Sequence, residues 1–221
     1  MTPVLIVTFR RPDYLARCIQ SINEPGFEVV VQDDSETDLG MSKSLNIGLR
    51  RCLNTHPEYI VCLNQDVVIQ PGGLTALVDF MDAHPRCGIA CGKILDITNP
   101  DRIMHGGTGR PWPSGEHLRG FVSKGDCAVS APMIWLNGAF NIYRTAALRE
   151  VGLHDERYFL YAQDADWPMM AWKMGWEAWY CAEATCLDEP YGASGDPSDY
   201  HKRLIQHDMM AFGAKWGGVN E

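Results

Sequence analysis

"YIVCLNQDVVIQPGGL", Tyr59 to Leu74, is an apolar run of strand length that stops at Asn64, Gln65 and Asp66 before apolar residues resume. A short apolar run with polar boundaries is typical of a buried strand. In open sheets with parallel strands, ligands bind beyond the carboxyl ends, because loops and helix N-termini converge there. The stretch therefore predicts a central strand with functional side chains at its carboxyl end.

Strand-like and helix-like segments alternate on both sides of this stretch. The strand candidates in the first hundred residues are Val4–Thr8, Phe27–Asp34, Tyr59–Leu63 and Cys87–Ile94. Between them, apolar residues recur at helical spacing: Leu15, Cys18, Ile19 and Ile22; Leu45, Leu49, Cys52 and Leu53; Leu74, Leu77, Val78 and Met81. This alternation predicts an α/β protein with a parallel sheet covered by helices.

The second half of the chain is less regular. Glycine and proline crowd the region from Asp96 to Pro132, where we expect a long loop or irregular short strands. Helices are expected near Ala146 to Val151 and in the segment that contains Pro168. Because proline is tolerated in the first turn of a helix, the second helix is expected to start near Ala165 or Asp166, with Asp164 at or just before its N-terminus.

The composition fits one ordinary globular domain spanning residues 1–221, with 46% hydrophobic and 21% charged residues. The net charge of -9 predicts no general attraction to nucleic acid or to anionic lipid. No apolar run approaches the roughly 20 residues that cross a bilayer, so no transmembrane segment is expected. The first apolar segment precedes the basic residues, the reverse of a signal peptide, so the expected location is cytoplasmic.

Eight cysteines are scattered through segments that read as core. A chain of this size can form a sufficient core without disulfides, so we expect buried free thiols. The spacing also lacks the two C-x-x-C pairs of a structural zinc site.

Polar side chains lie at the ends of the first three predicted strands, and Thr8 to Arg11 close the first. Asp33 and Asp34 end the second strand, and Asp66 follows the third. One interpretation is that these residues cap turns and helices, which is the commonest role of such aspartates. The other is a shared polar crevice in which Asp66 holds Mg²⁺ or Mn²⁺, since both ions prefer carboxylates together with substrate phosphates. Asn64 adds no charge, so metal and diphosphate are expected to bind together.

Several longer motifs add to these patterns. They are the opening strand and helix "VLIVTFRRPDYLARCIQSI", then "VVVQDDSETD", "MSKSLNIGL", "CLNQDVVIQPGGL" and "NGAFNIYRTAALREVGLHDERYFLYAQDADWPMMAWKMGW". In order and spacing they resemble, almost end to end, a minimal GT-A glycosyltransferase of the family-two type, rhamnosyltransferase-like. The resemblance implies the GT-A fold, a mixed and mostly parallel sheet flanked by helices. It also implies a nucleotide-binding half at 1–95 and an acceptor-binding, catalytic-base half at 96–221.

The resemblance also implies roles for individual residues. Asp164 would be the general base, and Asp66 would hold the ion on the donor diphosphate, with Asp188 as a further ligand where many relatives have histidine. Donor-binding positions would be Thr8, Phe9, Arg11, Asp33, Asp34, Asn46, Asn64, Gln65, Gly138 and Ala139. Asp166 is expected to support the site or to cap its helix. Gln163 replaces the family's usual glutamate, and the missing charge should make Asp164 easier to ionise.

The implied function is an inverting, metal-dependent transfer of a sugar from a nucleotide diphosphate sugar to an acceptor hydroxyl. Uridine diphosphate is the default donor nucleotide, and the acceptor stays open among glycans, lipid-linked sugars and proteins. One alternative is a sugar nucleotidyltransferase, although "TFRRPD" lacks the glycines of a pyrophosphate loop. The other is an inactive nucleotide-sugar or glycan-binding module, which Asn64 and Gln163 make conceivable.

Overall fold

The structure is a computed structural model that describes residues 1–106, 127–189 and 198–217. The first half contains β1 (Thr2–Thr8), α1 (Pro12–Ser21), β2 (Phe27–Asp33), α2 (Met41–Leu53), β3 (Tyr59–Asn64), β4 (Val68–Ile69), α3 (Gly73–Ala83) and β5 (Cys87–Asp96). The second half contains β6 (Asn99–His105), β7 (Ala131–Pro132), β8 (Phe140–Arg144), α4 (Thr145–Val151), α5 (Gln163–Lys173), β9 (Glu177–Asp188) and α6 (Asp199–Trp216). The α/β class and the alternating elements of the first half are confirmed.

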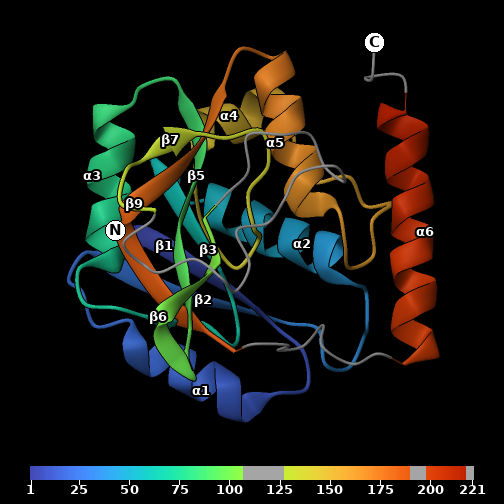
Figure 1. Ribbon diagram of the computed structural model, residues 1–221, viewed down its shortest axis with the longest axis horizontal. Coiled ribbons are helices and arrows are strands. Elements are labelled where there is room, and N and C mark those ends of the chain that lie inside the picture. The colour runs from blue at the N-terminus through green and yellow to red at the C-terminus, as the bar shows by residue number, and fades with distance from the viewer. Residues whose placement is uncertain (107–126, 190–197, 218–221) are drawn as a thin grey trace.

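The described strands form one mixed sheet in the order β2-β1-β3-β8-β5-β9-β4, with β6 paired to β5 and β7 to β9 (Figure 1). β1 is parallel to β2 and β3, and β5 is parallel to β9. β8 is antiparallel to both of its neighbours, β3 and β5. Consequently β2, β1, β3, β5 and β9 all point the same way, and their carboxyl ends share one edge of the sheet with the start of β8.

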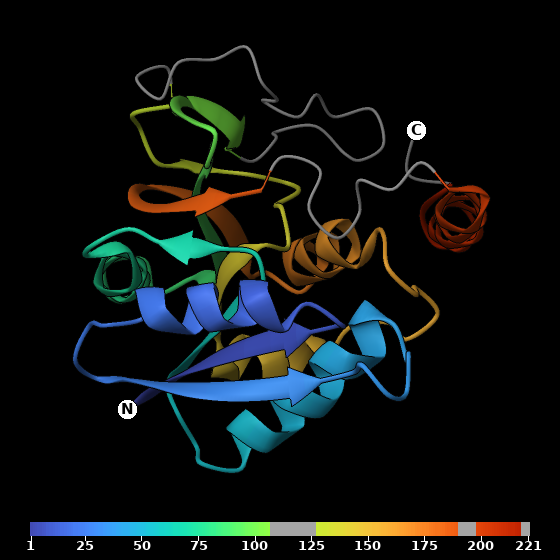
Figure 2. The same cartoon turned by 90° about the horizontal axis from the view of Figure 1, so that it is seen from below.

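Side chains of β1 show how the sheet is covered on both faces. Val4 and Ile6 pack with residues of α1 and α3, whereas Leu5 and Val7 pack with residues of α2, α4 and α5. This division follows from the alternation of side chains along a strand. α6 is separate from both layers, and Figure 2 shows it end-on, apart from the helices that cover the sheet. Its buried residues pack instead with the segment that leads into α5.

One difference from expectation concerns the second half. β9 was not anticipated, because its twelve residues interleave glutamates and alanines with large apolar side chains and show no clear period. The region from Asp96 to Pro132 contains the short strands β6 and β7, in agreement with one of its two expected forms, while residues 107–126 within it lie outside the described chain.

The predicted start of the helix around Pro168 was wrong. α5 begins at Gln163, after Ala162 in the left-handed conformation with φ 69°, and Pro168 lies inside it. Proline at that position removes one intrahelical hydrogen bond, the one that the Asp164 carbonyl would accept. Asp164 therefore lies in the first turn, where the helix dipole favours a negative charge.

The prediction of free thiols is confirmed. All eight cysteines are unpaired with one another, and seven of them are buried. The half-buried Cys127 is the exception.

Gly92 tests the packing between β5, β8 and β9. A Cβ atom there would collide with the Phe140 ring and lie 2.9 Å from the Ala184 carbonyl oxygen. We expect Gly92→Ala to cost about 1–3 kcal/mol through overpacking. That cost corresponds to a loss of several degrees in Tm at roughly 2–4 °C per kcal/mol.

The matched control is Gly213→Ala in α6, where a Cβ atom would meet nothing within 4 Å. Alanine is the better helix former, so its Tm should stay or rise. Equal Tm values for Gly92→Ala and the wild type would contradict the packing described here.

Candidate active site

The edge at which the parallel strands end collects the predicted site residues. Thr8, Asp33, Asn64 and Asp188 are the last residues of β1, β2, β3 and β9. Gly138 and Ala139 directly precede β8, and Asn64 donates its backbone N–H to the Ala139 carbonyl oxygen over 3.0 Å. The fold thus brings together residues that are far apart in the sequence.

Gln65 joins the ends of two strands. Its Oε1 accepts hydrogen bonds from Thr8 Oγ1 at 2.6 Å and from the Phe9 N–H at 2.9 Å, and its Nε2 donates to the Phe9 carbonyl oxygen. The side chain is 4% exposed. Gln65 therefore fixes the backbone at the end of β1, and a direct contact between Gln65 and a donor stays a prediction.

Asp34 closes the loop between β2 and α2. Its buried carboxylate accepts hydrogen bonds from Thr37 Oγ1 at 2.6 Å and from the N–H groups of Leu39 and Gly40 at 2.8 and 3.1 Å. These contacts are of the turn-capping kind that the sequence left open. The exposed Asp33 accepts the Ser35 N–H, and its hydrogen bonds lower the pKa of Asp33.

Arg11 and Asn46 contact their own surroundings. The exposed Arg11 pairs with Asp13 at 3.1 Å, and its guanidinium lies over the Tyr14 ring. Asn46 is buried in α2 and exchanges hydrogen bonds with the backbone N–H and carbonyl of His154. Roles for both side chains in donor binding stay predictions.

Asp66 and Asp188 form a pair of neighbouring carboxylates. In the antiparallel pairing of β4 with β9, Val68 lies opposite Leu187, so Asp188, one residue after Leu187, and Asp66, two residues before Val68, lie on the same side of this pair. Asp66 is 5% exposed. Burial, and then the charge of Asp66, raise the pKa of Asp188 to about 8, while the Glu189 N–H and the charge of Arg17 oppose the rise.

The carboxylates of Asp66 and Asp188 suit a hard divalent cation. A positive ion would relieve the repulsion that raises the Asp188 pKa, and Mg²⁺ and Mn²⁺ prefer carboxylate oxygens. Across residues 1–106, 127–189 and 198–217, no group of three or more His, Cys, Asp and Glu side chains is arranged to hold a metal. Any ion at this pair would need additional oxygens from water or from a bound diphosphate.

Asp164 lies against the start of β8. The Gly138 N–H donates to Asp164 Oδ2 over 3.2 Å, and a Cβ atom at Gly138 would lie 3.3 Å from Asp164 Cβ. Burial raises the pKa of Asp164 to about 6, and the Gly138 N–H partly opposes this rise. The carboxylate is ionised at neutral pH yet accepts a proton more readily than an ordinary aspartate, which suits a general base.

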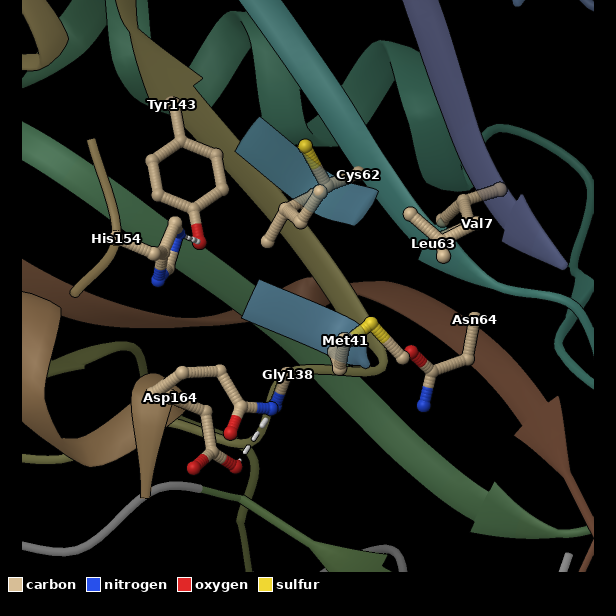
Figure 3. A pocket seen from close by; sticks show the side chains of 11 residues that line it. Val7, Met41, Cys62, Leu63, Asn64, Gly138, Tyr143, His154 and Asp164 are labelled. Atoms are coloured by element: carbon tan, nitrogen blue, oxygen red, sulfur yellow. Dashed lines mark hydrogen bonds between the residues drawn. The ribbon is translucent and has the colours of Figure 1, made fainter. Parts of the chain in front are cut away.

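A small cavity of about 20 Å³ lies beneath this edge, lined by Asn64, Met41, Gly138 and Asp164. Figure 3 shows Asp164 and Asn64 on opposite sides of it, with Gly138 between them. The cavity holds about one water molecule and not a sugar nucleotide, so a donor would bind on the open edge above it.

Tyr143 and His154, both buried, also line the cavity. Their Oη and Nε2 atoms are 3.2 Å apart (Figure 3). Burial lowers the pKa of His154 to about 4, so its ring is neutral at pH 7. Nothing in the sequence around His154 indicates that it lies beneath the site.

Asp166 links α5 to α6 and to the segment that precedes α5. Its buried carboxylate accepts hydrogen bonds from Tyr158 Oη at 3.0 Å, Trp216 Nε1 at 2.7 Å and Lys215 Nζ at 2.8 Å. Asp208 in α6 is a second buried carboxylate near α5, which the sequence interpretation missed. A signal was available, because Asp208, Phe212 and Trp216 recur at intervals of four residues and form the buried face of α6.

The family model "Glycosyl transferase family 2" matches residues 35–152, more than half of the chain. The N-acetylglucosaminyl-diphospho-decaprenol L-rhamnosyltransferase of two Mycobacterium tuberculosis strains is 29% identical over 159 residues. That match covers 65% of this chain and 51% of the relative. The chain thus spans about half the length of the mycobacterial proteins it matches.

Solved structures share the fold. GalNAc-T7 with UDP, GalNAc and Mn²⁺ superposes with a TM-score of 0.69 at 12% identity, covering 86% of this chain and 44% of that one. S. aureus TarS 1-349 gives 0.60 at 17% identity, covering 97% and 72%. The mannosyltransferase PcManGT from Pyrobaculum calidifontis, with GDP-Man and Mn²⁺, gives 0.55 at 17% identity, covering 96% and 64%. These neighbours are GT-A glycosyltransferases, so the expected fold is confirmed.

None of the helices in the described ranges has the length and apolar character required to span a membrane.

The carboxylate pair predicts an unusual effect of Asp188→Asn on stability without metal. The folded-state pKa of Asp188, about 8, exceeds its ordinary value of 3.8. Proton binding by Asp188 therefore stabilises the folded state, and this stabilisation is fully present below pH 4 and is lost as the pH rises through 8. In chelator at pH 8, Asp188→Asn should therefore melt about 2 °C or more above the wild type, with a smaller difference at pH 5.

Asp199→Asn is the control, since the Asp199 side chain is 85% exposed. It should leave Tm unchanged at both pH values. If Asp188→Asn melted below the wild type in chelator at pH 8, burial and the charge of Asp66 would not destabilise the Asp188 carboxylate as described.

Proposed function

The chain belongs to glycosyl transferase family 2, and we propose that it transfers a sugar from a nucleotide diphosphate sugar to an acceptor hydroxyl, with inversion at the anomeric carbon. The observation that carries the proposal is the position of Asp164 on the same sheet edge as Asp66 and Asp188. A proton acceptor and an anionic pair suited to a cation are the two chemical groups that this transfer needs.

Asp164 acts as the base in the proposed mechanism. Its carboxylate accepts the proton of the acceptor hydroxyl as the oxygen attacks the anomeric carbon from the face opposite the leaving diphosphate. The Gly138 N–H holds Oδ2 over 3.2 Å, and further hydrogen bonds from the backbone of Asp164 and Ala165 and from Trp135 help to orient the carboxylate. Gln163, in place of a glutamate, adds no charge that would disfavour ionised Asp164.

Asp66 and Asp188 would hold Mn²⁺ or Mg²⁺ together with the donor diphosphate. A divalent ion bound there would neutralise the charge that develops on the departing nucleoside diphosphate. Support comes from the mutual repulsion of the two carboxylates and from the Mn²⁺ present in the GalNAc-T7 and PcManGT structures.

The donor and acceptor classes follow from relatives. TarS was solved in complex with UDP-GlcNAc and PcManGT in complex with GDP-Man, and we propose a uridine diphosphate sugar as the first donor to test. The mycobacterial relative is named for L-rhamnose transfer to a diphospho-decaprenol-linked sugar. A lipid-diphosphate-linked sugar is therefore the first acceptor to test, before free glycans and proteins.

The reaction products separate this proposal from its rivals. Purified protein is incubated with nucleotide diphosphate sugars, with Mn²⁺ or with chelator. The proposal expects nucleoside diphosphate to be released in a metal-dependent way and faster with acceptor present. Pyrophosphate would instead indicate a sugar nucleotidyltransferase, and binding without any product would indicate a binding module.

Asp164→Asn removes the base while keeping the shape of the side chain. We expect donor affinity to stay within about twofold and kcat to fall by about 10²–10⁴-fold, the usual contribution of base catalysis. In the wild type, kcat should also fall as the pH drops below about 6, because the Asp164 carboxylate becomes protonated. Steady-state kinetics from pH 5 to 8 measure both effects, and normal turnover in Asp164→Asn would refute the base.

Asp66→Ala removes one oxygen ligand of the proposed ion. UDP binding, measured by calorimetry, should tighten with Mn²⁺ in the wild type and lose most of that enhancement in Asp66→Ala. Glu36→Gln, which removes an exposed carboxylate from the β2–α2 loop, should keep the enhancement. An Asp66→Ala protein with undiminished Mn²⁺ enhancement would contradict the assignment.

A further inference from the structure

The segment of residues 155–162, here called the approach segment, leads directly into the first turn of α5. It contains no helix or strand of its own, so its backbone groups need other partners. Asp155, within the segment, binds the N–H groups of Arg157 and Tyr158, and further partners come from two helices, α2 and α6.

Asp208 of α6 supplies the largest share of them. Its fully buried carboxylate accepts the N–H groups of Phe159 at 2.9 Å and of Leu160 and Tyr161 at 2.8 Å each. His207 Nδ1 is also 2.9 Å from Asp208 Oδ1. Hydrogen bonds to an ionised acceptor are about twice as strong as neutral ones, and three consecutive N–H groups on one carboxylate fix the direction of the chain.

α2 also holds the same segment. The Met41 N–H donates to the Phe159 carbonyl oxygen over 2.6 Å. Gly40, at φ 85°, allows this approach, because a Cβ atom there would lie 2.6 Å from the same oxygen. Both backbone groups of Phe159 are thus bound, one to each helix.

The inner face of α6 contacts the approach segment and α5. Phe212 and Trp216 pack in one cluster with Tyr158, Ala162 and Ala165, and the cluster contains no residue of a strand. Lys215 and Trp216 also bind Asp166 in the first turn of α5. A helix that merely covered the sheet would pack on the strands instead.

The last N–H group that Asp208 binds is that of Tyr161, one residue before the turn that sets the direction of α5. Ala162 follows Tyr161 directly and takes the left-handed conformation, and α5 then begins with Gln163 and Asp164. A change in the direction of the approach segment would rotate this first turn and move the Asp164 carboxylate from the Gly138 N–H.

We propose that Asp208 is a positioning residue for Asp164: by binding the three N–H groups of Phe159–Tyr161, it holds the first turn of α5 where the base meets the acceptor. This role rests on the proposed function, in which Asp164 takes the acceptor proton.

The test compares Asp208→Ala and Asp208→Asn with the wild type. Because displacement of a reacting group by about 1 Å can cost about 10²-fold, kcat should fall by that order in Asp208→Ala. Asn keeps one carbonyl oxygen that can accept, so its loss should be smaller. KM for the donor and the affinity for UDP should stay within about twofold, and hydrogen exchange should show faster exchange at the amides of residues 159–161.

Two controls separate positioning from loss of stability. Asp199→Asn changes an exposed carboxylate on the same helix and should leave kcat unchanged. Leu77→Ala, on the buried face of α3, should lower Tm at least as much as Asp208→Ala, while kcat per folded molecule is retained.

A double substitution identifies the residue through which Asp208 acts. If Asp208 works through Asp164, then Asp208→Ala should cost little further kcat in the Asp164→Asn background. An equal fold-loss in both backgrounds, or unchanged kcat and amide exchange in Asp208→Ala, would overturn the positioning role. Normal turnover in Asp164→Asn would overturn the proposed base, an outcome distinct from either.

Discussion

The common direction of five strands is the constraint on which the site depends. β2, β1, β3, β5 and β9 point the same way, so their carboxyl ends lie along one edge. β8 runs in the opposite direction between β3 and β5, so its amino end, with Gly138 before it, lies at that same edge. The loops that follow these strands therefore lie along the same edge. Residues as distant in the sequence as Thr8 and Asp188 are brought to it.

The buried carboxylates of the protein differ in how their charge is compensated. Asp34 and Asp208 are bound by backbone N–H groups, and Asp166 by Lys215 together with two aromatic donors. Such hydrogen bonds and ion pairs allow a buried charge to be stable. Asp66 and Asp188 differ from these because each lies beside a like charge. Repulsion of this kind is characteristic of sites that bind a cation or move a proton.

The sequence predicted the elements whose pattern is local. Strands β1, β2, β3 and β5 and their helices follow from apolar runs and helical spacing, and acidic residues at strand ends predicted the edge at which the structure gathers Asp33, Asn64 and Asp188. β9 could not be found in this way, because it packs on both faces among neighbours that come from distant parts of the chain. The start of α5 was misplaced because Pro168 was treated as a start signal, whereas tertiary contacts at Ala162 and Asp166 set it. Asp208 was missed because its four-residue spacing with Phe212 and Trp216 was not read as a buried helix face, and because its backbone partners at Phe159–Tyr161 cannot be identified from the sequence.

Diffraction from crystals containing Mn²⁺ and UDP, recorded at the manganese absorption edge, tests the account most directly. It shows whether the carboxyl ends of the parallel strands hold a cation-bound donor. The account predicts an anomalous peak between the carboxylates of Asp66 and Asp188, in contact with the diphosphate of UDP, with Asp164 on the side where the sugar would extend. A manganese peak elsewhere, or UDP bound away from the ends of β1 and β3, would contradict it.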